Sequence, residues 1–121
     1  MSTFTIDPGM DIRTAYSRPS NTSVTDALEA PALQSITVLG VRIVNLNTSS
    51  TVAATVEHYD GTNPTYQLYQ YPVPASGVVE LDIPFTLGRT EKVRVTAATA
   101  DELHFTITYF EQPKALGVGG T

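Results

Sequence analysis

The sequence predicts an all-β fold: an antiparallel β-sandwich, jelly-roll or immunoglobulin-like, with six to eight short strands. Apolar and polar residues alternate in several runs, and this period of two places successive side chains on opposite faces of a strand. Turn-forming residues separate the runs at intervals of roughly 8–12 residues, which is typical of two packed sheets. No stretch shows the apolar period of 3.6 residues that would predict a long helix.

By this pattern the chain divides into three parts. An extended N-terminal arm covers residues 1–32, the β-sandwich covers residues 33–111, and a glycine-rich C-terminal tail covers residues 112–121. Within the sandwich, the alternating runs between residues 71 and 111 are joined by short turns, which predicts an antiparallel meander. A chain of 121 residues has room for a single core.

The arm differs in composition from the rest of the chain. Residues 17–23 are polar and turn-prone, and residues 25–29 could form one helical turn that Pro31 would end, although so short a helix is unstable alone. Structureless segments of this length are uncommon inside compact domains and are usually functional or disordered. One interpretation is a frayed terminus. We favour an arm that binds a protein partner through its apolar residues, Phe4, Ile6, Met10, Ile12 and Tyr16.

The strands of the sandwich follow in order. The nearly continuous apolar run at residues 36–46 predicts a central strand that is either covered on both faces or kinked at Gly40. Asp60-Gly61 predicts a hairpin, and Pro72 and Pro74 confine the end of the next strand to a sheet edge. The predicted strands are residues 36–46, 52–59, 66–71, 79–83, 93–97 and 103–109, with a short additional strand at 85–87 as an open alternative.

Composition argues against several classes of function. The sequence contains no cysteine, so disulfides, thiol nucleophiles and thiolate metal sites are excluded. The net charge is −5 and no segment offers a basic face, so we expect no nucleic-acid partner. No apolar run approaches the ~20 residues that span a bilayer, and the N-terminus lacks the pattern of a signal peptide, so we expect neither a membrane partner nor secretion.

No catalytic, cofactor-binding or metal site is predicted, and we expect no enzymatic activity. His58 and His104 are the only histidines, whereas a zinc site usually takes three or four protein ligands. A Ser-His-Asp arrangement can assemble in space from distant residues, but the serines cluster in loops with ordinary turn roles. Glu80 and Asp82 have the spacing of the solvent face of a strand.

Tyrosines crowd one predicted strand. A regular strand would place Tyr69 and Tyr71 on one face and Tyr66 on the other, with Tyr59 across the hairpin. These residues either fill the edge of the sandwich, because aromatic residues favour pleated surfaces, or form a protein interface or a glycan platform. The candidate interface aromatics are Tyr59, Tyr69 and Tyr71.

The order of these strands and turns resembles that of small β-sandwich virion proteins of tailed bacteriophages. That group includes capsid decoration (cement) proteins and tail or neck components, and the resemblance covers about residues 36–111 and none of the arm. The segments that carry it include residues 41–48 (VRIVNLNT), 56–61 (VEHYDG), 66–68 (YQL), 71–77 (YPVPASG), 79–82 (VELD), 87–95 (LGRTEKVRV), 97–98 (AA) and 109–111 (YFE).

This resemblance implies a non-enzymatic virion structural protein without cofactors. The expected role is a decoration protein on the head surface of the virion, made in the host cytoplasm, that binds the outside of the major capsid protein shell and stabilises it. Its expected partners are the major capsid protein and neighbouring copies of itself in a homo-oligomer, with the arm adding a strand to a capsid subunit. A tail, neck or fibre component is one alternative, and a carbohydrate-binding adhesion module is another.

Overall fold

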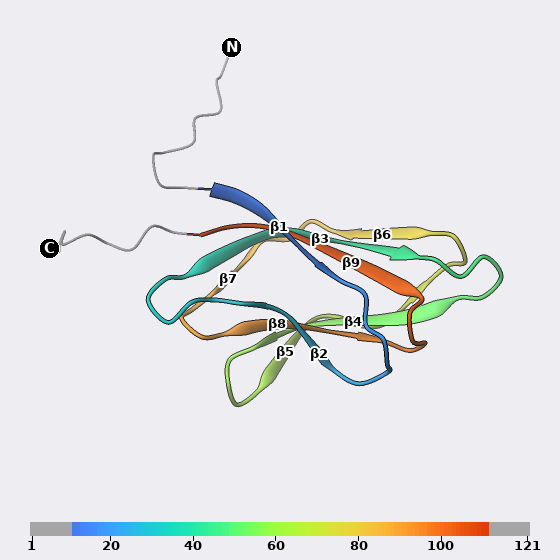
Figure 1. Cartoon of the computed structure of the whole chain (residues 1–121), viewed down its shortest axis with the longest axis horizontal. Helices are drawn as coiled ribbons and strands as arrows, with labels where there is room; N and C mark the ends of the chain where they lie inside the picture. The colour runs from blue at the N-terminus through green and yellow to red at the C-terminus, as the bar shows by residue number, and fades with distance from the viewer. Residues whose placement is uncertain (1–10, 112–121) are drawn as a thin grey trace, which may run out of the picture.

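The protein, in a computed structural model, is described over residues 11–111, which form two antiparallel β-sheets packed face to face (Figure 1). This confirms the predicted β-sandwich. Sheet A consists of β1 (Asp11–Ser17), β3 (Ile36–Asn45), β6 (Val78–Leu81), β7 (Phe85–Leu87) and β9 (Leu103–Glu111). Sheet B consists of β2 (Thr25–Glu29), β4 (Val52–Tyr59), β5 (Pro64–Val73) and β8 (Lys92–Ala97).

Two of these nine strands lie in the segment that we expected to be an extended arm. Strand β1 pairs antiparallel with β9 in sheet A, and β2 pairs antiparallel with β8 in sheet B. Residues 25–29 are therefore a strand rather than a helical turn, because pairing with β8 satisfies backbone groups that a single helical turn would leave to water. The chain passes from the upper to the lower layer of Figure 1 between β1 and β2.

The core lies between the two sheets. Alternate residues of the central strands face inward, and their burial contributes ~1.5–3 kcal/mol for each large side chain. The buried apolar side chains include Ile36, Val38, Ile43, Leu87, Leu103, Phe105 and Ile107 from sheet A and Val52, Val56, Val73, Val93 and Val95 from sheet B.

Strand β3 is bent by a bulge. Its register with β9 shifts between Val38 and Gly40, so Leu39 has no partner and the apolar phase of the strand changes there. A Cβ atom at Gly40 would lie 3.2 Å from the carbonyl oxygen of Leu81. The kink at Gly40 is thus the correct alternative for this strand, since a glycine allows the neighbouring backbone to approach.

A buried asparagine ties two loops, β3–β4 and β5–β6, to the end of the sandwich. The Asn45 side chain is buried, and its Nδ2 donates to the carbonyl oxygens of Ser50 and Val73 at 3.0 Å each and of Pro74 at 3.2 Å. Its Oδ1 accepts from the backbone N–H of Asn47 at 2.8 Å. Asn45 therefore fixes the end of β5 against the end of β3.

Candidate protein-binding surfaces

The predicted arm residues are only partly within the described chain. Phe4, Ile6 and Met10 lie outside the described residues. Ile12 and Tyr16 lie on β1, where their partners on β9 are Phe110 and Thr106 respectively. The side chains of Ile12 and Tyr16 are 47% and 78% exposed, and both lie on the outer face of sheet A, four residues apart along β1.

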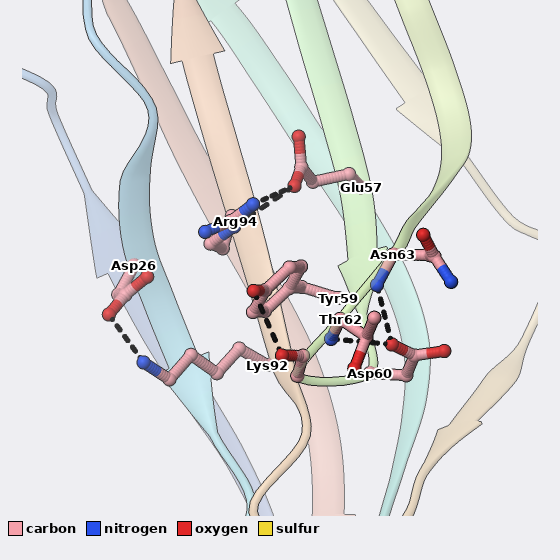
Figure 2. Close-up of polar contacts among 9 residues, drawn as sticks. Asp26, Glu57, Tyr59, Asp60, Thr62, Asn63, Lys92 and Arg94 are labelled. Carbon is pink, nitrogen blue, oxygen red and sulfur yellow. Dashed lines mark hydrogen bonds and ion pairs between the residues drawn. The ribbon is translucent and has the colours of Figure 1, made fainter.

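The outer face of sheet B carries an ion pair stacked on an aromatic ring (Figure 2). Nε and Nη2 of Arg94 donate to Oε2 of Glu57 at 2.9 and 2.7 Å, and the Glu57 side chain is nearly fully buried. The Cζ atom of Arg94 lies 3.6 Å from the centroid of the Tyr59 ring. The guanidinium is thus held between a carboxylate and a ring face, which fixes its plane.

Tyr59, a predicted interface residue, stacks against Arg94 and also contacts the β4–β5 turn. Its hydroxyl donates to the carbonyl oxygen of Gly61 at 3.0 Å, in the turn that joins β4 to β5. In the same turn, Asp60 Oδ1 accepts from the backbone N–H groups of Thr62 and Asn63 at 2.8 Å each (Figure 2). These bonds from Asn63 and Thr62 hold the pKa of the Asp60 carboxyl below its ordinary value, because they favour its charged form.

The edge of sheet B beside this face carries a second ion pair. Lys92 Nζ donates to Asp26 Oδ2 at 3.0 Å, joining β8 to β2. The hydrogen bond to Asp26 and the charge of that carboxylate raise the pKa of Lys92. The labelled charges of this face, those of Asp26, Glu57, Lys92 and Arg94, are therefore paired as Figure 2 shows.

The tyrosines of β5 do not follow the regular alternation expected from their spacing. The register with β4 shifts around Thr55, and Gln70 has a φ of 45°. The Thr55 hydroxyl accepts the backbone N–H of Gln70 at 3.0 Å, which stabilises this bulge. This first shift inserts one residue and so reverses the face of Tyr69 relative to Tyr71. A second shift, between Val56 and Glu57, inserts another residue between Leu68 and Tyr66 and so places Tyr66 on the face of Tyr69.

As a consequence, Tyr69 lies with Tyr66 and not with Tyr71. The rings of Tyr66 and Tyr69 meet edge to face with centroids 4.7 Å apart, and both side chains are about half exposed or more. Tyr71 is opposite the buried Ala54, so it extends the inner side of the sheet at its edge. The expectation that Tyr69 and Tyr71 share a face is wrong because a local bulge cannot be seen in the spacing of side chains.

His58 lies at the end of the core, as its phase in β4 indicated. Its Nε2 is 2.7 Å from Oε1 of Glu91, and its ring stacks on Phe85 with centroids 5.8 Å apart. Glu91 Oε1 also accepts the backbone N–H of Gly88 at 2.8 Å. The hydrogen bond from His58, followed by that from Gly88, lowers the pKa of Glu91. This pair joins the β7–β8 turn to β4.

The described chain offers no evident reaction centre. Within residues 11–111 there is no group of three or more histidine, aspartate or glutamate side chains that could hold a metal ion, and no hydrogen bond joins a histidine to a serine. A shallow depression of about 300 Å³ near Gly40 is lined by the Arg42–Glu80 ion pair, Asp82 and two threonines. Residues 11–111 contain no helix that is long and apolar enough to cross a membrane.

Comparisons with known proteins give the fold a context. No protein-family model and no curated protein sequence matches the chain. A chain from the acid-stable capsid of Helicobacter pylori bacteriophage KHP30 has 14% sequence identity and a TM-score of 0.60, over 89% of this chain and 91% of that chain. A chain from the capsid asymmetric unit of cyanophage Pam1 has 17% identity and a TM-score of 0.53, over 93% of each chain.

A third similar structure comes from a different kind of assembly. A chain from Bacillus endospore appendages, described as a family of disulfide-linked pili, has 14% identity and a TM-score of 0.51, over 93% of this chain and 99% of that chain. All three alignments span nearly the whole sandwich. The resemblance to small β-sandwich proteins of phage virions is thereby confirmed at the level of the fold.

Proposed function

We propose that this chain is a non-enzymatic structural protein of a bacteriophage virion and that it acts as a decoration (cement) protein on the outside of the major capsid protein shell. The observation that carries this proposal is the fold similarity to chains of two phage capsids over about nine-tenths of each chain. The outward surfaces of both sheets agree with a binding role, since they present exposed apolar and aromatic residues.

The pairing of β1 with β9 determines from where the N-terminal segment would contact a capsid shell. Asp11 and Glu111 are register partners, so the two ends of the described chain lie at adjacent positions at one end of sheet A. Phe4, Ile6 and Met10 belong to the segment that precedes β1. In our proposal this segment adds a strand to a sheet edge of a capsid subunit, and repeated contacts over the shell supply avidity.

A filament subunit is a second candidate, favoured by the similarity to the spore-appendage chain. That family is described as disulfide-linked, whereas this sequence contains no cysteine. A filament of this chain would therefore depend on noncovalent contacts alone. A tail or neck component is the corresponding alternative within a virion.

Co-sedimentation with capsids assembled without this protein tests the proposal. Saturable binding of tens to hundreds of copies per particle, as repetition over an icosahedral shell predicts, would support the decoration role. Binding of about five to twelve copies would assign the protein to a neck or tail symmetry axis instead. Filaments formed without capsids, visible by electron microscopy, would favour the second candidate.

A truncation separates the role of the N-terminal segment from that of the sandwich. Deletion of residues 1–10 leaves all nine strands in place, whereas deletion to residue 30 would also remove β1 and β2. We expect the shorter truncation to keep the circular dichroism and unfolding transition of the full chain but to lose capsid binding. Unimpaired binding by the truncated protein would contradict the role of the segment.

A further inference from the structure

The edges of the two sheets are not equally protected against pairing with another strand. Natural sheets block their edges with prolines, bulges or very short strands, because an open edge is a template for further pairing. Strand β5 has Pro64, Pro72 and two register shifts, β2 is five residues long with a shift, and β6 and β7 have four and three residues. Each of these edges carries a recognised protection.

Strand β1 has none of these three protections, and a charge that it carries on its inner-facing side, that of Arg13, is paired with Glu111 of β9 at 3.8 Å. It is seven residues long, contains neither proline nor glycine, and pairs with β9 at seven consecutive positions without a register shift. Among the described residues, β9 is the only strand with which β1 pairs. One side of β1 is therefore a regular, uninterrupted edge.

The side chains of β1 make this edge complementary to itself. Ile12, Thr14 and Tyr16 share the outer face of sheet A, and Tyr16 has the largest exposed fraction of the large apolar residues described, 78%. If two β1 strands pair antiparallel around a two-fold axis through Thr14, Ile12 of each copy lies opposite Tyr16 of the other. Pairs of an aromatic and a β-branched residue are favourable across strands.

The neighbouring symmetric registers are worse. An axis through Arg13 places Ile12 opposite Thr14 and leaves Tyr16 without a partner on β1. It also places the two Arg13 side chains directly opposite each other, each paired with Glu111 of its own copy. An axis through Ala15 places Ile12 opposite Arg18, which lies beyond the end of β1. The register centred on Thr14 is thus the symmetric one that pairs both exposed apolar residues with apolar partners.

We propose that β1 is a self-association edge, and that two copies of this chain pair antiparallel through β1 around Thr14 to join their A sheets into one continuous sheet. The two-fold contact is isologous, so it closes after two copies. This inference goes beyond the proposed function, because it concerns the protein in solution and requires no capsid.

Charge substitutions at the two exposed positions test both the contact and its direction. We expect the full chain to form a concentration-dependent dimer in analytical ultracentrifugation. The double variant I12K/Y16K places lysines opposite each other in the proposed register and should raise the dimer dissociation constant at least about tenfold. The matched variant I12K/Y16E changes the same two positions but places each lysine opposite a glutamate, so it should remain dimeric.

Other arrangements of the two copies give different results. In a parallel pairing, I12K/Y16E would oppose lysine to lysine and glutamate to glutamate, so its loss of the dimer would overturn the proposed direction. A monomeric full chain at all concentrations would overturn the proposal itself. So would loss of the dimer on deletion of residues 1–10 together with its retention in I12K/Y16K, because the pairing strand would then be that segment.

Cross-linking provides a test that does not depend on weakening the dimer. The sequence has no cysteine, so T14C introduces a single thiol. Residues directly opposite in an antiparallel pair have Cα atoms about 4.5–5.5 Å apart, within the range of a disulfide. We expect T14C to form a covalent dimer under mild oxidation and the exposed control T86C, on β7 of the same sheet, to remain monomeric. Equal cross-linking of the two variants would contradict the proposal.

Discussion

Strands β1 and β5 are both edge strands with exposed aromatic residues, but they differ in the regularity of their backbone pairing. Strand β5 is interrupted by two register shifts and bounded by prolines, whereas β1 runs in unbroken register along β9. The exposed tyrosines of β5 therefore lie on an edge that is protected against pairing with another strand. Tyr16, in contrast, lies on β1, an edge that lacks prolines and bulges. An exposed aromatic residue is informative about binding only together with the hydrogen-bonding state of its strand.

The first prediction concerns the residue that fixes the end of β5. Asn45→Ala removes three donated bonds and one accepted bond and leaves the carbonyl of the buried Val73 without this partner, so it should lower the free energy of unfolding by about 2–4 kcal/mol. Chemical denaturation measures this loss. Asn47→Ala is the matched control: its bonds to Ser49 and Ser50 lie in an exposed turn, so about 0.5–1 kcal/mol is expected. Equal losses of unfolding free energy in the two variants would show that Asn45 contributes no more to stability than an exposed turn residue.

A second prediction concerns the bulge at Gln70, which interrupts β5 whereas β1 has none. The variant removes one hydrogen bond that stabilises this bulge. Thr55→Val preserves the shape of the side chain but removes the acceptor of the Gln70 N–H, so we expect a loss of about 1–2 kcal/mol in the free energy of unfolding. Thr55→Ser retains the hydroxyl and should cost less. The protection of the Gln70 amide in hydrogen exchange should fall in the valine variant only. Unchanged exchange would mean that another partner holds this amide.

A third prediction uses the bond that joins the β7–β8 turn to β4. Because the folded protein holds the pKa of Glu91 below its ordinary value of 4.5, the carboxylate contributes stability that is fully present above pH 4.5 and is lost as the pH falls through the lowered value. The difference in unfolding free energy between the native chain and Glu91→Gln should therefore be larger at pH 6 than at pH 3. A difference that does not vary with pH would contradict this coupling.

The smallest effect on stability, and the most direct test of the comparison, comes from the two exposed tyrosines. Tyr16→Ala and Tyr69→Ala each truncate a side chain that is at least 60% exposed, so each should change the free energy of unfolding of the monomer by less than about 0.5 kcal/mol. We expect Tyr16→Ala alone to weaken dimerisation. Weakened dimerisation in Tyr69→Ala, measured by ultracentrifugation, would move the self-association surface to sheet B.

Much of the sandwich was predictable because its strands carry a local signal. In β8 and β9 buried and more exposed positions alternate along the chain, as the period of two indicated. Strand β3 also followed its sequence, with Gly40 at the bulge. These features depend on neighbouring residues alone, so a single sequence reveals them.

Strands β1 and β2 were not predictable in the same way. The larger apolar residues of β1, Ile12 and Tyr16, point outward, and its contribution to the core is the small Ala15. Strand β2 is short and interrupted by a register shift at Ala27. Such strands exist because β9 and β8 offer partners for their backbones, and their side-chain pattern does not record that pairing.

The class of the fold, the positions of the core strands and the lack of cysteine could all be read from the amino-acid sequence, because hydrophobic alternation, turn residues and composition are local properties. Only the tertiary structure decided which strands form the edges, which faces Tyr69 and Tyr71 occupy, and that Asn45 joins β3 to the end of β5. These features arise from hydrogen bonds between residues far apart in the chain. Their geometry is set when the sheets close, and no spacing of side chains along one strand specifies it.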